Sequence, residues 1–227
     1  MRRWAGIAGI AFVVLAFAAQ LVQGDVPSTE TGDATERFAR FYADEDNYGR
    51  AALAAVLGLV GQFAFLWFVG GLWSTLRTTT ATTTPSIVVA LGGASFFVLG
   101  TLEHLVDNVV GIILNFSESG GYQPDPGLAL TLSALAGGIF LAGMIAAGAT
   151  TLAAGLMIRQ TAVFPRWLLW VGVAITVLSL TTIPLLSFIA ALLLAVWVVI
   201  VSAEMIRRAQ PEPGEPAPPA TPASPAT

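Results

Sequence analysis

The sequence contains no cysteine and no lysine, one histidine and few charged residues of any kind. The absence of cysteine excludes disulfide bridges, thiolate metal sites and a cysteine nucleophile. With 11% charged and 56% hydrophobic residues, this 227-residue chain cannot cover a core with a solvated surface. Its formal net charge of -4 provides no basic surface for nucleic acid. The composition therefore predicts an integral membrane protein whose partner is the lipid bilayer.

Long apolar runs fill most of the chain, and about 20 such residues are needed to cross roughly 30 Å of hydrocarbon. The uncharged stretch at residues 167–203 is too long for one crossing, so we expect it to fold back near Thr181, Thr182 and Pro184. The sequence thus predicts an all-α fold, a polytopic transmembrane helical bundle with six spans in residues 1–208 and a disordered Pro-rich C-terminal tail. The expected spans are about 4–22, 51–76, 86–110, 128–158, 167–183 and 185–206, with a cytoplasmic tail at 209–227.

Arginine positions give an independent argument for six spans, because cytoplasmic loops collect basic residues. Under this count four groups of arginines fall on one side, which predicts a plasma-membrane protein with both termini cytoplasmic. These arginines are Arg2, Arg3, Arg77, Arg159, Arg166, Arg207 and Arg208. The first span has an alternative interpretation as a cleavable signal peptide, which would leave five spans. Its apolar core is long for a signal peptide, so we expect the span to be retained.

The predicted external loop, residues 23–49, carries seven carboxylates. It contains acid-before-base pairs at a spacing of four, such as Asp33 with Arg37, and aromatic residues on the opposite helical face. This pattern predicts a short amphipathic helix that rests on the membrane interface by its aromatic face. The alternative is a divalent-cation site at residues 44–46, but that run lacks the spaced oxygen ligands and the turn glycine of a calcium loop.

Small residues recur every four positions in the predicted fourth span. They include Ala134, Gly138, Ala142 and Ala146. Small side chains at this spacing allow a neighbouring helix backbone to approach closely. We therefore expect the fourth span to lie at the centre of the bundle. The pattern leaves open whether the neighbour belongs to the same chain or to a second copy in a homo-oligomer.

One group of titratable side chains, Glu103, His104 and Asp107, interrupts the apolar runs and is followed by Asn108. On a helix Glu103 and Asp107 share a face. A charged group costs about 3 kcal/mol at the bilayer centre on insertion scales, so such residues usually face the bundle interior or water. The group can be a neutralised structural patch or a proton or cation relay. A metal site is the poorest interpretation, because one histidine and two carboxylates supply too few ligands.

The sequence offers no serine–histidine pairing and no glycine-rich phosphate loop. We therefore predict no catalytic residue, no cofactor and no metal. The remaining interpretation is a non-enzymatic structural or sensory membrane protein. The alternative is a small transporter or proton-coupled channel that uses Glu103, His104 and Asp107. The sequence does not identify the small molecule or ion that either protein would handle.

Four short segments carry a family resemblance. They are RWAG at residues 3–6, FYAD at 41–44, FLWFVGGL at 65–72 and FPRWL at 164–168. These segments resemble uncharacterised multi-pass membrane proteins common in actinobacteria, a domain-of-unknown-function group with five to six spans. The resemblance covers most of residues 1–208. It implies a multi-span architecture and a retained first span, and it carries over no catalytic residue.

Overall fold

The computed structural model describes residues 2–27, 29, 32–77, 83–116, 124–161 and 163–209, which form helices and no strand. The predicted tail lies outside these residues except for its first position. The helices are α1 (Arg2–Gln23), α2 (Ala34–Tyr42), α3 (Glu45–Arg77), α4 (Thr83–Phe116), α5 (Pro126–Thr161), α6 (Leu168–Leu180) and α7 (Pro184–Arg207). The all-α class is therefore confirmed.

Five of the described helices, α1, α3, α4, α5 and α7, are long and apolar enough to cross a membrane. Large apolar side chains such as Trp4, Leu21 and Trp67 lie exposed on the outside of the bundle, as expected where lipid replaces water. Helix α6 has 13 residues, so it is about 20 Å long, whereas the hydrocarbon layer is roughly 30 Å thick. The described residues thus contain five helices of membrane length, whereas the sequence predicts six spans.

The chain reverses direction between α6 and α7. Thr182 has a left-handed backbone conformation with a φ of 53°, which a helix cannot contain. Pro184 is the first residue of α7, where its missing N–H leaves no helical hydrogen bond unmade. The Trp197 indole of α7 donates a hydrogen bond of 3.2 Å to the carbonyl oxygen of Leu168. Helix α7 therefore runs back beside α6.

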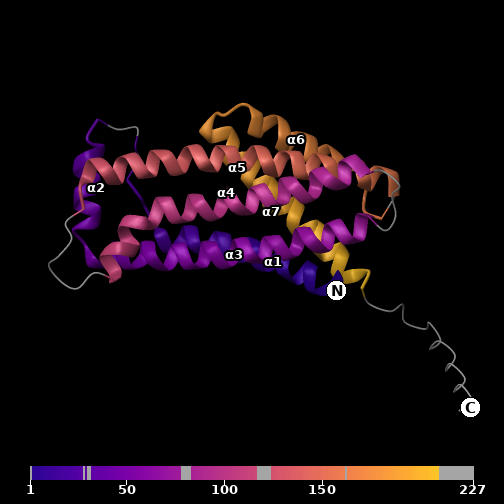
Figure 1. Ribbon diagram of the computed structural model, residues 1–227, viewed down its shortest axis with the longest axis horizontal. Coiled ribbons are helices and arrows are strands. Elements are labelled where there is room, and N and C mark those ends of the chain that lie inside the picture. The colour runs from indigo at the N-terminus through magenta and orange to yellow at the C-terminus, as the bar shows by residue number, and fades with distance from the viewer. Residues whose placement is uncertain are drawn as a thin grey trace, which may run out of the picture.

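One end of the bundle gathers the helix ends that carry the seven arginines discussed above. Gly71, near the end of α3, packs directly against Ala5 at the start of α1, and a Cβ at Gly71 would lie 3.4 Å from Met205 near the end of α7. At the same end, Gly155 of α5 approaches Leu169 of α6. In Figure 1 the N-terminus lies at this end, and α2 lies across the opposite end of the bundle.

Glycines bring α5 and α6 into close contact. A Cβ at Gly155 would lie 2.8 Å from the Cα of Leu169, and a Cβ at Gly148 would lie 2.9 Å from the Cα of Thr176. The Thr176 hydroxyl also donates a hydrogen bond of 2.9 Å across the interface to the Gly148 carbonyl oxygen. Such backbone proximity allows helices to associate in lipid, where no hydrophobic drive exists between them.

The small-residue row predicted on α5 is only partly packed. Ala134, Gly138 and Ala142 are exposed, and a Cβ at Gly138 would meet no atom within 4 Å. Ala146 is half-buried, and its carbonyl oxygen lies close to Gly92 of α4. Within the described part of one chain, the outer three residues have no close helix neighbour. The prediction that a neighbouring helix, of this chain or of a second copy, packs on these three residues therefore stays a prediction.

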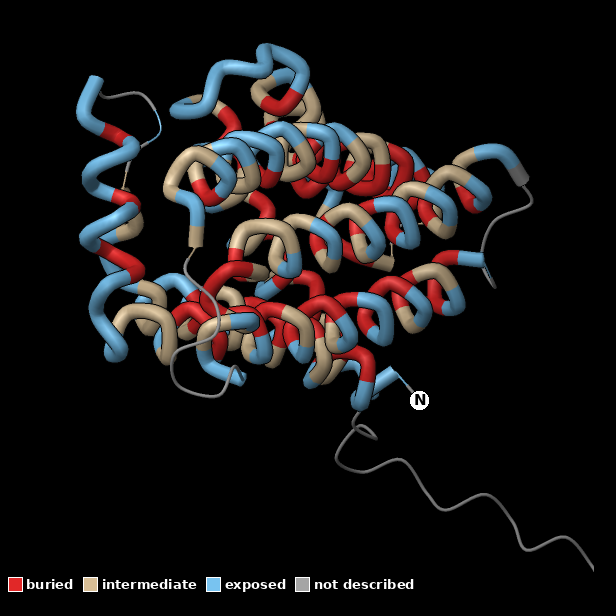
Figure 2. Tube along the Cα trace, turned by 60° about the vertical axis from the view of Figure 1, so that its left-hand side comes forward, coloured by how far each residue is buried: buried red, intermediate tan, exposed pale blue. Residues whose placement is uncertain are grey.

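Helix α2 packs on protein rather than on lipid. Phe38, Phe41 and Tyr42 are buried in a small cluster with Val110 of α4 and Ala129 of α5. Figure 2 shows the buried side of α2 turned toward the bundle. Its two acid-before-base pairs form on the exposed side, each at 3.2 Å. The expectation that the aromatic face rests on the membrane interface is therefore wrong, since that face covers the ends of α4 and α5.

Candidate functional site

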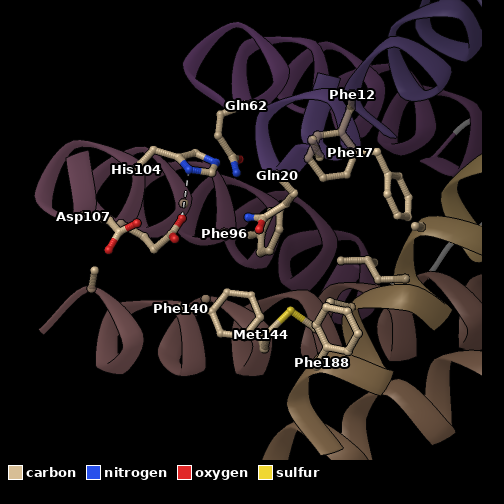
Figure 3. A pocket seen from close by; sticks show the side chains of 18 of the residues that line it. Phe12, Phe17, Gln20, Gln62, Phe96, His104, Asp107, Phe140, Met144 and Phe188 are labelled. Atoms are coloured by element: carbon tan, nitrogen blue, oxygen red, sulfur yellow. Dashed lines mark ion pairs between the residues drawn. The ribbon is translucent and has the colours of Figure 1, made fainter. Parts of the chain in front are cut away.

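A cavity of about 430 Å³ lies among α1, α3, α4, α5 and α7 (Figure 3). This volume falls in the range of roughly 300–1,000 Å³ typical of small-molecule sites. Most of the wall is aromatic or aliphatic, and one part of it is polar. The polar lining residues are Gln20, Gln62, Glu103, His104, Asp107 and Ser133. The cavity therefore presents an apolar space with a polar group of side chains at one place in its wall.

Glu103 and His104 of α4 form a pair at the polar part of the cavity. His104 Nδ1 lies 3.2 Å from Glu103 Oε2. The imidazole ring also packs directly on Gly58 of α3, where a Cβ would lie 2.6–2.7 Å from ring atoms. Only glycine at position 58 leaves room for the ring, so the packing of α3 against α4 fixes the position of His104.

Asp107 lies one helical turn after Glu103 and accepts hydrogen bonds from two other helices. Gln23 Nε2 of α1 donates to Asp107 Oδ2 at 2.8 Å, and Ser133 Oγ of α5 donates to Asp107 Oδ1 at 3.1 Å. Helix α2 is close as well: burial, and secondarily the negative charge of Asp107, raises the pKa of Tyr42 to about 12. Asp107 therefore links α1, α4 and α5 beneath the α2 helix.

Asn108 differs from the other three residues that the sequence analysis grouped together. Its side chain is buried outside the cavity lining. Asn108 Nδ2 donates to the carbonyl oxygen of His104 at 3.0 Å, and its Oδ1 accepts from Gln23 at 3.3 Å. The structure thus brings Glu103, His104 and Asp107 to the cavity and gives Asn108 a role in joining α1 to α4.

Gln62 of α3 is a cavity residue with an unmet hydrogen-bonding need. The residue is 5% exposed, and its amide packs against Gly100 of α4. Its Oε1 has no hydrogen-bond partner among the described residues. In Figure 3 the Gln62 amide and the His104 ring point toward one another. A buried acceptor left unsatisfied costs about 1–3 kcal/mol, so a donor placed in the cavity would be stabilised there.

The cavity opens on the side of the bundle and is closed toward the arginine-bearing end. Phe17 of α1 and Phe188 of α7 line it while remaining about half exposed. Toward the arginine-bearing end, Phe68, Leu72 and Trp197 are at most 1% exposed within the main hydrophobic core. Since the sides of a membrane-spanning bundle face lipid, the opening is lateral.

Sequence reasoning missed the contributions of α1 and α5 to this site. Gln20 and Gln23 lie three residues apart at the end of α1 and so share one face of an apolar span. Two polar side chains on one face could have predicted a polar contact with another helix. Ser133 gave no comparable signal, because its contact with Asp107 depends on how α5 packs.

Residues 44–46 are exposed, and Asp44 Oδ1 accepts a hydrogen bond from the Asp46 N–H at 3.0 Å, so Asp44 caps the start of α3. The described residues contain no group of three or more histidine, aspartate or glutamate side chains that could hold a metal ion.

Comparison of the chain with models of known protein families, with curated protein sequences and with solved structures gives no match. The resemblance to the actinobacterial membrane proteins therefore stays a prediction.

Proposed function

We propose that this chain is a non-enzymatic plasma-membrane protein that binds a small, largely apolar molecule in its intramembrane cavity and senses that molecule. The observation that carries the proposal is the cavity itself, which combines an apolar wall with a polar group containing Glu103, His104 and Asp107. Protein interiors are otherwise close-packed, and filling such a space would stabilise a purely structural bundle. A retained cavity with convergent polar groups is the usual form of a binding site.

The proposed topology has six spans with both termini cytoplasmic. Its support is the gathering of the arginine-bearing helix ends at one end of the bundle, which the contact of Gly71 with Ala5 illustrates. In this arrangement α6, together with the residues beside it, forms a short sixth crossing. Helix α2 then covers the external end of the bundle.

A sensory role is favoured over an open channel by the packing on the cytoplasmic side of the cavity. Phe68, Leu72 and Trp197 fill that region and are almost fully buried. A conducting pore needs a path lined by water or polar groups. The polar group of the cavity is instead separated from the arginine-bearing end by this tightly packed core.

A small transporter or proton-coupled channel is the second candidate function. The observation that favours it is the pairing of His104 Nδ1 with Glu103 Oε2 at 3.2 Å in the cavity wall. Intramembrane carboxylate and imidazole groups mark proton relays in pumps and transporters. Transport would require a second conformation in which the buried core opens toward the cytoplasm.

Binding in the cavity is tested by filling it. The wild-type protein in phosphatidylcholine nanodiscs is titrated with adamantylamine, adamantanol and adamantanecarboxylate, rigid molecules that share one apolar cage. Gly143 lines the cavity, and a Cβ there would make an ordinary contact of 3.6 Å with Leu99 Cβ. Gly143→Leu should therefore fold and occupy the cavity, which abolishes saturable binding.

The matched control is Gly138→Leu on the same helix, outside the cavity lining and with no atom within 4 Å of the added Cβ. This variant should bind the probes as the wild type does. Absence of saturable binding of all three probes to the wild type overturns the proposed function. Equal binding by the Gly143→Leu variant shows that the probes bind elsewhere and also overturns it.

A further inference from the structure

We infer that the ligand of the cavity is a lipophilic organic cation, with an ammonium group bound by Glu103 and Gln62 Oε1 and an apolar body among the phenylalanine rings. This inference rests on the proposed function, because it names the class of molecule that the cavity binds. Three independent features of the cavity support it. They are the excess of acidic over basic side chains in the lining, the Gln62 oxygen that lacks a hydrogen-bond donor, and the aromatic wall.

The cavity lining holds two carboxylates and one imidazole, and neither lysine nor arginine. Even a protonated His104 can neutralise only one of the two negative charges of ionised Glu103 and Asp107. A ligand with a positive charge would balance the second, whereas an anionic ligand would be repelled. In a desolvated site this balance decides which head group is accepted, because an unpaired buried charge is strongly destabilising.

Glu103 is the carboxylate available to a ligand. Both oxygens of Asp107 accept hydrogen bonds from protein donors, one from Gln23 and one from Ser133. Glu103 contacts His104 of its own helix through Oε2, and no side chain from another described helix donates to it. An ammonium group can therefore pair with Glu103 without displacing a hydrogen bond between helices.

Gln62 supplies a second acceptor on the opposite helix. Its Oε1 is buried and has no partner among the described residues, while the side chain lines the cavity. An ammonium group has donors for several acceptors and offers no acceptor itself, so it suits a site made of a carboxylate and an amide oxygen. A ligand that lacks donors would leave Gln62 Oε1 unsatisfied.

The rest of the wall fits an apolar body and favours a positive charge. Five phenylalanine rings line the cavity: Phe12, Phe17, Phe96, Phe140 and Phe188. Aromatic faces attract a cation that lies over the ring. The lateral opening beside Phe17 and Phe188 lets a lipophilic amine enter from the bilayer.

The three adamantane probes also test this inference, since they differ only in the head group. The amine should bind the wild-type protein about tenfold more tightly than the alcohol, as one charge-assisted hydrogen bond predicts. The carboxylate should bind more weakly than the alcohol. If the alcohol or the carboxylate binds as tightly as the amine, the cavity still binds a ligand, but the assignment to cations is overturned. This result differs from the absence of all binding, which overturns the proposed function as well.

Two variants assign the head-group site. Glu103→Gln should lower the affinity for the amine to that for the alcohol and change the alcohol affinity by less than about threefold. Asp107→Asn should have a smaller effect on the amine, since Asp107 already accepts two hydrogen bonds. Gln62→Met keeps the length of the side chain, removes the acceptor and should also weaken amine binding. Thermal unfolding without ligand checks that each variant is folded. Full amine preference in both Glu103→Gln and Gln62→Met would overturn the assigned site.

Discussion

Two glycines on α5 provide a direct test of the arrangement of helices around the cavity. Gly155 lies against α6, and a Cβ there would be 2.8 Å from the Cα and 2.9 Å from the Cδ1 of Leu169. Gly138 lies on the outer half of the same helix, where an added Cβ would meet no atom within 4 Å. Replacing each glycine by leucine therefore compares a packed position with an open one in the same helix.

The two variants should change stability in opposite directions. In Gly155→Leu, α5 and α6 must separate until the Cβ contact reaches at least 3.4 Å, and the rest of the leucine side chain needs further space. Overpacking of this kind costs about 3 kcal/mol, while the better helix propensity of leucine returns less than about 1 kcal/mol. We expect a net loss of about 2 kcal/mol. Gly138→Leu should gain about 0.5 kcal/mol from helix propensity alone.

Thermal unfolding of the wild type and of both variants, all in one detergent, measures the two effects. For a chain of this length, a loss of about 2 kcal/mol should lower the Tm of Gly155→Leu by about 4–8 °C, and Gly138→Leu should unfold at or slightly above the wild-type temperature. A loss of stability in Gly138→Leu equal to that in Gly155→Leu would refute the reasoning. It would show that a second copy or another partner covers the outer half of α5, which is exposed in the single chain.

Four further measurements address topology, the contact of α2 with the site, and transport. Reporter fusions after Arg77 and after Arg208 should both read cytoplasmic. An external result after Arg208 would contradict the proposal that α6 and α7 cross the membrane as two separate spans. Because the pKa of Tyr42 rises from 10.0 to about 12 on folding, the unfolded chain releases this proton first as the pH increases. As the pH rises through the range between these two pKa values, the free energy of unfolding should therefore decrease by at most about 3 kcal/mol. Tyr42→Phe should lose this part of the pH dependence. In a spectroscopic titration of the folded protein, Asp107→Asn should lower the pKa of Tyr42, and an unchanged value would contradict the contact of α2 with the site. If the protein transports protons or cations, Glu103→Gln should abolish flux into proteoliposomes, and wild-type vesicles without flux would count against the second candidate function.

The all-helical fold could be predicted from the sequence because lipid imposes a strong constraint on every span. Each membrane-crossing segment needs about 20 apolar residues, and five such segments form long helices in the structure. The same reasoning expects a sixth span at residues 167–183, where the helix has 13 residues. Hydropathy alone could not give this length, since Thr181, Thr182 and Ile183 leave the helix through local backbone geometry rather than through polarity.

The candidate site could be predicted only where its residues lie on one helix. Glu103, His104 and Asp107 are close in sequence, so helical spacing was sufficient to place them together. Gln62 and Ser133 join them through contacts between helices that lie far apart in the chain. Such contacts depend on where one helix crosses another. Gly58, which packs against the His104 ring, helps to determine that crossing, but a glycine in the sequence does not reveal which helix will pack on it.

The short length of α6 connects the fold to the cavity. Antiparallel packing pairs Leu169 with Gly155 and Thr176 with Gly148, so α6 ends close to the middle of α5. Figure 1 shows α6 lying along only part of α5. Helix α7 then begins at Pro184, beyond the reversal, and its first half supplies Phe188 to the rim of the cavity. A longer α6 would continue alongside the outer half of α5 and move the start of α7 outward with it. The glycine contacts and the early reversal thus determine where the cavity that Glu103 lines opens on the side of the bundle.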